Sequence, residues 1–128
     1  MSIALFFVTH EGIASNLLHI AEAIIQKQNN NLSFIEVPMD ADLDTIINSI
    51  ESKLNSLNLN RGILFITDIY GGTPSNIAQL LATNYDANLI SGVNLPMIIS
   101  LLNYRNKTEQ VLIQKALDGA HKGIQVNN

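Results

Sequence analysis

The chain alternates between short apolar runs and longer segments whose apolar residues recur at helical spacing. A continuous apolar run of about four to eight residues is typical of a buried strand, whereas apolar residues three and four positions apart indicate an amphipathic helix. The runs predict strands at 3–8, 32–37, 63–66 and 88–93. Because the two patterns alternate along the chain, we expect βαβ units and a parallel sheet.

The helical segments are expected from near Gly12, over 43–57, after Thr73, from Pro96 and over 108–121. In the first of them the predicted buried stripe is Ile13, Leu17, Ile20, Ala21, Ile24 and Ile25. Thr73 is predicted as an N-cap, with Pro74 at the first helical position, where its missing N–H is not needed. Gly123 is expected to end the last helix, which leaves 124–126 as a possible short edge strand.

These elements predict one α/β domain over residues 1–128, because neither an internal repeat nor a linker divides the chain. Right-handed crossovers make a flavodoxin-like, doubly wound parallel sheet with strand order 2-1-3-4 the simplest arrangement. The first and third strands are then neighbours. His10 and Asp68 follow these two strands, so we expect them to flank the same crevice at the carboxyl edge of the sheet.

Composition narrows the class of protein further. The net charge is −4, and the 7 Lys and Arg residues form no cluster, which argues against nucleic acid as the main partner. There is no cysteine, so disulfides, thiol catalysis and cysteine metal sites are excluded. The apolar N-terminal run lacks the basic region and cleavage site of a signal peptide, and no apolar stretch reaches the length of a membrane span. We therefore expect a cytoplasmic protein without direct membrane insertion.

The residues after the first and third strands suggest phosphoryl chemistry. A carboxylate at Asp68 that accepts a hydrogen bond from His10 would fix the tautomer of the imidazole and make its other nitrogen more basic. That nitrogen could then attack phosphorus. The backbone N–H groups of Gly71, Gly72 and Thr73, at the start of a helix, could hold the phosphoryl oxygens.

A second positive helix end is expected near Gly12. By contrast, His19 on the polar side of the first helix and His121 near the end of the last helix are interpreted as solvated residues without a chemical role.

Three motifs together resemble a known family. They are Thr-His-Glu-Gly at 9–12, the run Asp-x-x-Gly-Gly-Thr-Pro-x-Asn at 68–76, and Ile-Ser-Gly-Val-Asn-Leu-Pro-Met at 90–97. In order and spacing they resemble the mannose-family enzyme IIA domain of the bacterial phosphotransferase system, over nearly the whole chain. The long central motif is specific, whereas the first would be weak alone.

The resemblance implies that His10 accepts a phosphoryl group from the phosphocarrier protein HPr and passes it to a histidine of enzyme IIB. It assigns Asp68 as the carboxylate beside the active histidine and Thr73 as the hydroxyl of the phosphate loop. No metal or organic cofactor is implied. Members of the family are cytoplasmic homodimers that exchange a C-terminal strand. The chain contains no enzyme IIB segment, so the acceptor is expected on a separate polypeptide.

Glu11 departs from the family pattern, because many relatives carry a small residue directly after the histidine. Its charge would repel a phosphohistidine if the side chain pointed inward, so we expect it to face solvent.

Two alternative functions stay open from the sequence. The chain could be a regulatory module in which phosphorylation of His10 reports the phosphoenolpyruvate state without sugar transport. It could also be a flavodoxin-like binding domain for a phosphorylated metabolite. The acidic residues at 40, 42, 44 and 51 match calcium-loop positions, but Thr45 replaces the required glycine, so a helix N-terminus is favoured there.

Overall fold

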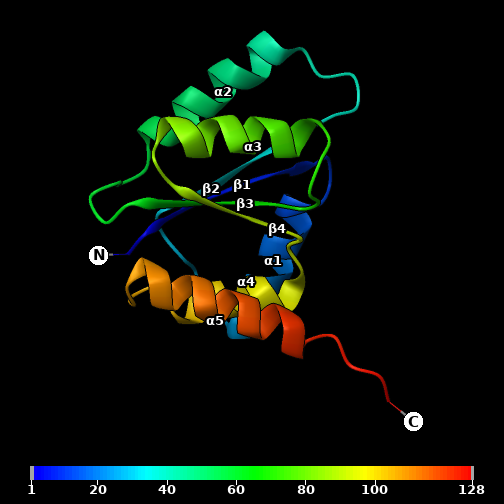
Figure 1. The fold of residues 1–128 in the computed structure, drawn as a ribbon, viewed down its shortest axis with the longest axis vertical. Coiled ribbons are helices and arrows are strands. Elements are labelled where there is room, and N and C mark those ends of the chain that lie inside the picture. The colour runs from blue at the N-terminus through cyan, green and yellow to red at the C-terminus, as the bar shows by residue number, and fades with distance from the viewer. Residues whose placement is uncertain (1, 128) are drawn as a thin grey trace.

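The computed structural model describes residues 2–127, which form a parallel sheet between two layers of helices (Figure 1). The strands are β1 (Ala4–His10), β2 (Leu32–Val37), β3 (Ile63–Thr67) and β4 (Asn88–Ser91). The helices are α1 (Ala14–Ile25), α2 (Leu43–Asn55), α3 (Thr73–Asn84), α4 (Leu95–Asn103) and α5 (Glu109–Lys122). All strand pairs are parallel, in the order β2-β1-β3-β4. The predicted fold class and strand order are confirmed.

Both faces of the sheet are buried. Successive side chains of a strand point to opposite faces, and a layer of helices covers each face. Leu5 and Phe7 of β1 pack into the core beside α1, α4 and α5. Phe6 and Val8 pack into a second core beneath α2 and α3. Figure 1 shows the same division, with α2 and α3 on one side of the sheet and α1, α4 and α5 on the other. The strands are therefore held in place by a packed core on each face of the sheet.

The element boundaries differ from the prediction where polar residues continue an apolar run. β1 extends through the polar residues Thr9 and His10 because both pair with β2, in register with Glu36 and Val37. His10 is therefore the last residue of the strand rather than a loop residue after it. β4 ends at Ser91, two residues earlier than predicted, because Gly92 adopts a φ of 89° that no strand residue takes.

The predicted stripe of α1 was wrong in part. The buried residues are Ala14, Leu18 and Ala21, while Ile20 and Ile24 are exposed. Periodicity finds the helix, but the direction of its buried face depends on how the helix lies on the sheet, which local spacing does not fix.

The C-terminal segment after α5 forms no strand within residues 124–127 of the structure. It leaves the helix at Gly123 and extends away from the sheet (Figure 1). Ile124 and Val126 are 74% and 90% exposed. The predicted edge strand is therefore absent from the single chain, while an exchange of this segment between two chains stays a prediction.

Candidate active site at the carboxyl ends of β1 and β3

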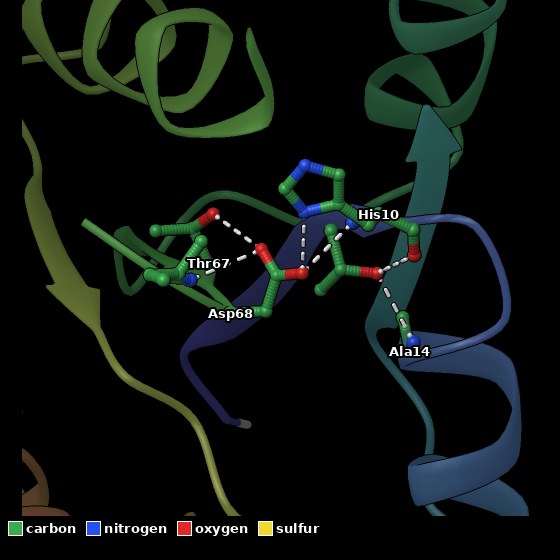
Figure 2. A network of polar contacts seen from close by, with 6 residues as sticks. His10, Ala14, Thr67 and Asp68 are labelled. Atoms are coloured by element: carbon green, nitrogen blue, oxygen red, sulfur yellow. Dashed lines mark hydrogen bonds and ion pairs between the residues drawn. The ribbon is translucent and has the colours of Figure 1, made fainter. Parts of the chain in front are cut away.

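His10 lies at the carboxyl end of β1, where two hydrogen bonds hold its backbone carbonyl. Its carbonyl accepts hydrogen bonds from the Thr9 hydroxyl at 2.9 Å and from the Ile13 N–H at 3.3 Å. The Thr9 hydroxyl oxygen in turn accepts the Ala14 N–H at 3.1 Å, at the start of α1 (Figure 2). Because Thr9 is fully buried, this bridge ties the residue before the imidazole to the first turn of the helix.

Asp68 follows β3, the neighbour of β1, and contacts His10 twice. Its Oδ2 accepts the backbone N–H of His10 at 3.0 Å and lies 2.8 Å from the ring nitrogen Nδ1. Its Oδ1 accepts the Ile69 N–H at 3.1 Å and the Thr67 hydroxyl at 3.3 Å. The side chain of Asp68 is 13% exposed and that of His10 is 38% exposed. The structure thus brings together two residues that are 58 positions apart in the sequence.

These contacts also determine the charge of Asp68. Burial of the carboxyl group by itself would raise its pKa, but the hydrogen bonds from the backbone and ring of His10 more than offset this, and the pKa of Asp68 is lowered. A carboxylate is therefore present near neutral pH. A carboxylate can only accept a hydrogen bond, so Nδ1 of a neutral His10 carries the proton and Nε2 keeps its lone pair. Nε2 points away from Asp68 (Figure 2).

The glycine-rich loop lies beside the imidazole. His10, Gly72 and Thr73 line the same cavity, of about 410 Å³, together with Met39 and other residues at the end of β2 and the start of α2. Gly71, directly before Gly72, is not among the residues that line the cavity. The predicted N-cap was wrong by one residue, because Gly72 is the N-cap and Thr73 is already helical.

This cap position has a physical basis. Gly72 has φ 86° and ψ 177°, a conformation essentially confined to glycine, and no side chain caps the helix. The first turn of α3 therefore presents its positive end at the cavity without a capping side chain. Such a helix N-terminus can attract an anion.

The N-terminus of α1 differs, and here the expectation of a second positive end was wrong. Glu36 of β2 accepts the Ser15 N–H at 2.8 Å and the Ser15 hydroxyl at 2.7 Å. Burial would raise the pKa of Glu36, but these bonds and one from the Gly12 backbone lower it. A carboxylate of the protein therefore already occupies this helix end, so it is not offered to a ligand.

Sequence reasoning missed Glu36 because it lies within a predicted strand. The only available signal was a charged residue at the end of an apolar run, and that signal does not reveal which helix it would meet. Glu11, in contrast, is exposed as expected. In residues 2–127 no group of three His, Cys, Asp or Glu side chains could hold a metal ion, and the acids around α2 form no such group. No helix within the same range is long and apolar enough to cross a membrane.

The structure thus places an oriented histidine beside an uncapped helix N-terminus at the carboxyl edge of a parallel sheet. Comparisons with known proteins identify the family to which the chain belongs. The family model EIIA-man, described as the PTS system fructose IIA component, matches residues 4–116. The chain therefore belongs to the mannose-type enzyme IIA family of the sugar phosphotransferase system (PTS). This membership supports a role in phosphoryl transfer.

Two relatives illustrate the range of the family. The chain is 29% identical over 127 residues to the PTS system mannose-specific EIIAB component of Escherichia coli K12, an alignment that covers 97% of the chain and 39% of that protein. It is 28% identical over 86 residues to the PTS system fructose-specific EIIA component of Bacillus subtilis, covering 66% of the chain and 59% of that protein. The chain thus spans about two fifths of the length of the E. coli relative.

Solved structures share the fold. The EIIA component from Streptococcus agalactiae has a TM-score of 0.81 at 24% identity, covering 97% of this chain and 96% of that one. The mannose/sorbose-specific IIA subunit from Enterococcus faecalis has a TM-score of 0.84 at 18% identity, covering 100% of this chain and 96% of that one.

Proposed function

We propose that the protein is a phosphocarrier of a sugar phosphotransferase system, in which Nε2 of His10 accepts a phosphoryl group from HPr and passes it to enzyme IIB. The observation that carries the proposal is the 2.8 Å contact between Nδ1 and the Asp68 carboxylate. This contact places the proton on Nδ1 and leaves the lone pair of Nε2 on the exposed side of the ring.

In the proposed reaction, the Nε2 lone pair forms a bond to phosphorus as the P–N bond to the donor histidine breaks. The electron pair of that bond returns to the donor imidazole. No proton has to leave His10 during attack, because Nδ1 keeps its hydrogen and the Asp68 carboxylate balances the positive charge that develops on the ring. Transfer to enzyme IIB is the same displacement, with His10 as the leaving group.

Gly72 and Thr73 are proposed to stabilise the phosphoryl oxygens during both transfers. They line the cavity that contains His10, and the uncapped start of α3 supplies backbone N–H groups and a positive dipole end. Gly71 allows the loop to turn into this position, with a φ of 90°. Phosphoryl transfer depends mainly on such positioning and charge stabilisation, so no metal or organic cofactor is required by this proposal.

The surroundings of His10 suit protein partners. Met39 lines the site cavity and is 94% exposed, and Tyr70, between Asp68 and the glycine loop, is 88% exposed. Exposed apolar and aromatic side chains around a reactive group are typical of a protein contact surface. We propose that HPr and enzyme IIB dock here in turn, in the cytoplasm. The alternative of a purely regulatory module is not favoured, because the curated relatives carry the names of sugar phosphotransferase components.

The test is incubation of the full chain with enzyme I, HPr and phosphoenolpyruvate, followed by mapping of the phosphoryl group. We expect label on His10 only, with the phosphorus on Nε2 in the NMR spectrum of the phosphorylated protein. His19→Ala is the matched control and should label normally, whereas His10→Ala should not. Normal labelling of His10→Ala would reject the proposal, and phosphorus on Nδ1 would reject the proposed role of Asp68. Addition of enzyme IIB should remove the label.

A further inference from the structure

A second polar cavity, of about 210 Å³, lies near the amino end of the sheet. It opens where the segment after α1 meets the turn after α4, and its charged lining residues are Lys27 and Arg105. The remaining lining is mostly amide and hydroxyl, including Asn29, Asn30 and Asn103. The proposed transfer reaction does not use either of these cations.

Arg105 is the unusual member of this lining, because it is a buried cation without an acidic partner. The residue is 6% exposed. Its Nη2 donates to the carbonyls of Ile3 at 2.8 Å and Asn31 at 3.0 Å and to the hydroxyl of Ser2 at 3.2 Å. Its Nε, although buried, has no hydrogen-bond partner in the described chain. Three neutral acceptors thus face one end of the guanidinium, and no carboxylate of residues 2–127 balances its charge.

Lys27 adds a second positive charge that no carboxylate of the described residues pairs with. Lys27 lines the same cavity, and among residues 2–127 neither it nor Arg105 has a carboxylate within ion-pair distance. The nearest acid along the chain, Glu22, does not line the cavity, and its Oε2 accepts the Asn29 N–H at 3.1 Å. Burial also lowers the pKa of Arg105, as expected for a cation that its surroundings do not fully compensate.

We infer that this cavity is an anion-binding site for a small phosphate- or carboxylate-bearing metabolite, held between Lys27 and Arg105. A guanidinium and an ammonium that face the same space attract an oxyanion, and the amide N–H₂ groups of Asn29, Asn30 and Asn103 can donate to its oxygens. The volume lies below the roughly 300–1,000 Å³ of pockets for drug-sized ligands, which favours a compact anion over a nucleotide.

This site is separate from the one at His10. Arg105 contacts Ile3, directly before β1, whereas His10 ends that strand seven residues later. At about 3.3 Å per residue, the two sites lie about 23 Å apart. An anion bound at Arg105 therefore cannot contact the phosphoryl group on His10, and the inference does not rest on the proposed function.

The experiment uses the full chain carrying His10→Ala, so that phosphate at the first site does not confuse the result. Inorganic phosphate is titrated against chloride at equal ionic strength, and backbone amide resonances are followed by NMR. We expect saturable shifts at Asn29, Asn30 and Asn103. Lys27→Glu should weaken this binding at least tenfold, and Lys27→Gln should weaken it less. Lys122→Glu, the same charge change in the last turn of α5, should change it less than twofold.

A linear, non-saturating response would overturn the inference, and so would equal weakening by Lys27→Glu and Lys122→Glu, which would indicate only the overall field of the protein. Arg105→Gln tests the buried cation directly, with its circular dichroism spectrum compared with that of the parent. A folded Arg105→Gln protein that binds phosphate with unchanged affinity would also overturn the inference. A parallel titration with acetate distinguishes a phosphate site from a general carboxylate site.

Discussion

At the scale of single residues, the site depends on Asp68 making two contacts with one residue. The carboxylate holds both the backbone N–H and the ring of His10, so the position of the strand end and the tautomer of the imidazole are set by the same group. Thr67 and the Ile69 N–H hold the other carboxylate oxygen and leave it little freedom to turn. The orientation of His10 is therefore established before any partner arrives.

Replacement of this carboxylate should slow transfer without unfolding the protein. In Asp68→Asn the amide keeps the shape of the side chain but loses the negative charge that stabilises the developing imidazolium. We expect phosphorylation of His10 by HPr to slow by about 10- to 100-fold, by analogy with the loss caused when the carboxylate partner of a metal-bound histidine is removed. Rapid-quench measurements would test this. An unchanged rate in a folded Asp68→Asn protein would contradict the orienting role.

Gly72 offers a second test at this scale, because its conformation rather than its contacts matters. A Cβ at Gly72 would meet nothing within 4 Å, so the penalty of Gly72→Ala comes from its φ of 86° alone. We expect a loss of about 1–3 kcal/mol in the free energy of unfolding and transfer slowed by about 10- to 100-fold as the loop shifts.

The matched control for this substitution is Gly62→Ala. Gly62 has φ 94°, an added Cβ would make only an ordinary 3.5 Å contact, and the residue lies directly before β3, at the end opposite His10. It should lose stability in the same range while transferring phosphate normally. Equal slowing in both variants would show that the effect of Gly72→Ala reflects stability and not the loop.

At the scale of secondary structure elements, the two helices that begin near His10 differ in how their N-termini are capped. The N-terminus of α1 is capped from β2 by Glu36, while that of α3 begins at Gly72 with no side-chain cap. Only one of the two positive ends is thus available to an anion. The α1 end is closed by Glu36, which is in register with Thr9, the residue before His10.

Glu36→Gln should destabilise the protein in a pH-dependent way. The folded-state pKa of Glu36 lies below its usual value of 4.5, so its stabilisation is present above about pH 4.5 and is lost as the pH falls through the folded-state pKa. We expect a loss of about 1 kcal/mol at pH 7 that shrinks as the pH falls below about 4.5 and through the folded-state pKa. Urea unfolding at several pH values measures it.

The exposed neighbour Glu11 provides the control for this comparison. Glu11→Gln should change the free energy of unfolding by less than about 0.5 kcal/mol at any of these pH values. A pH-independent loss in Glu36→Gln would show that the residue acts through packing and not through its charge.

At the scale of the whole molecule, the described residues leave the outer edges of β2 and β4 and one terminal segment without strand partners. β4 is an edge strand, and the segment after α5 extends away from the body with Ile124 and Val126 exposed (Figure 1). An unpaired edge and an extended apolar segment are the two halves of a strand exchange. This agrees with a homodimer, which we propose as the functional assembly.

Removal of residues 124–128 should therefore shift the protein from dimer to monomer. Because residues 124–127 make no strand with their own chain, the truncated protein should keep its circular dichroism spectrum. Sedimentation at micromolar concentration measures the outcome. The full chain carrying Val111→Ser, a change at another exposed apolar residue, is the control and should remain dimeric. A truncated protein that still sediments as a dimer would place the interface elsewhere.

Local pattern was sufficient for the helices, the strands of the sheet, the strand order and the pairing of His10 with Asp68, but not for the strand predicted at 124–126. The features that it found depend on rules that act over short stretches or on simple topology. Apolar runs mark buried strands, and the order 2-1-3-4 makes the first and third strands neighbours. Local pattern did not predict which face of α1 is buried, and Ile20 and Ile24 are exposed. Several apolar stripes fit a helix of this composition.

The sequence by itself thus determined the fold class and the family, and it predicted that His10 and Asp68 lie side by side, because these features reside in apolar periodicity and in motifs that are contiguous along the chain. Only the tertiary structure decided which helix end is open to an anion, that Glu36 closes the other, and that Arg105 is buried without an acidic partner. The physical reason is that hydrogen bonds and charge balance depend on groups that approach through space, and no local pattern records those distances.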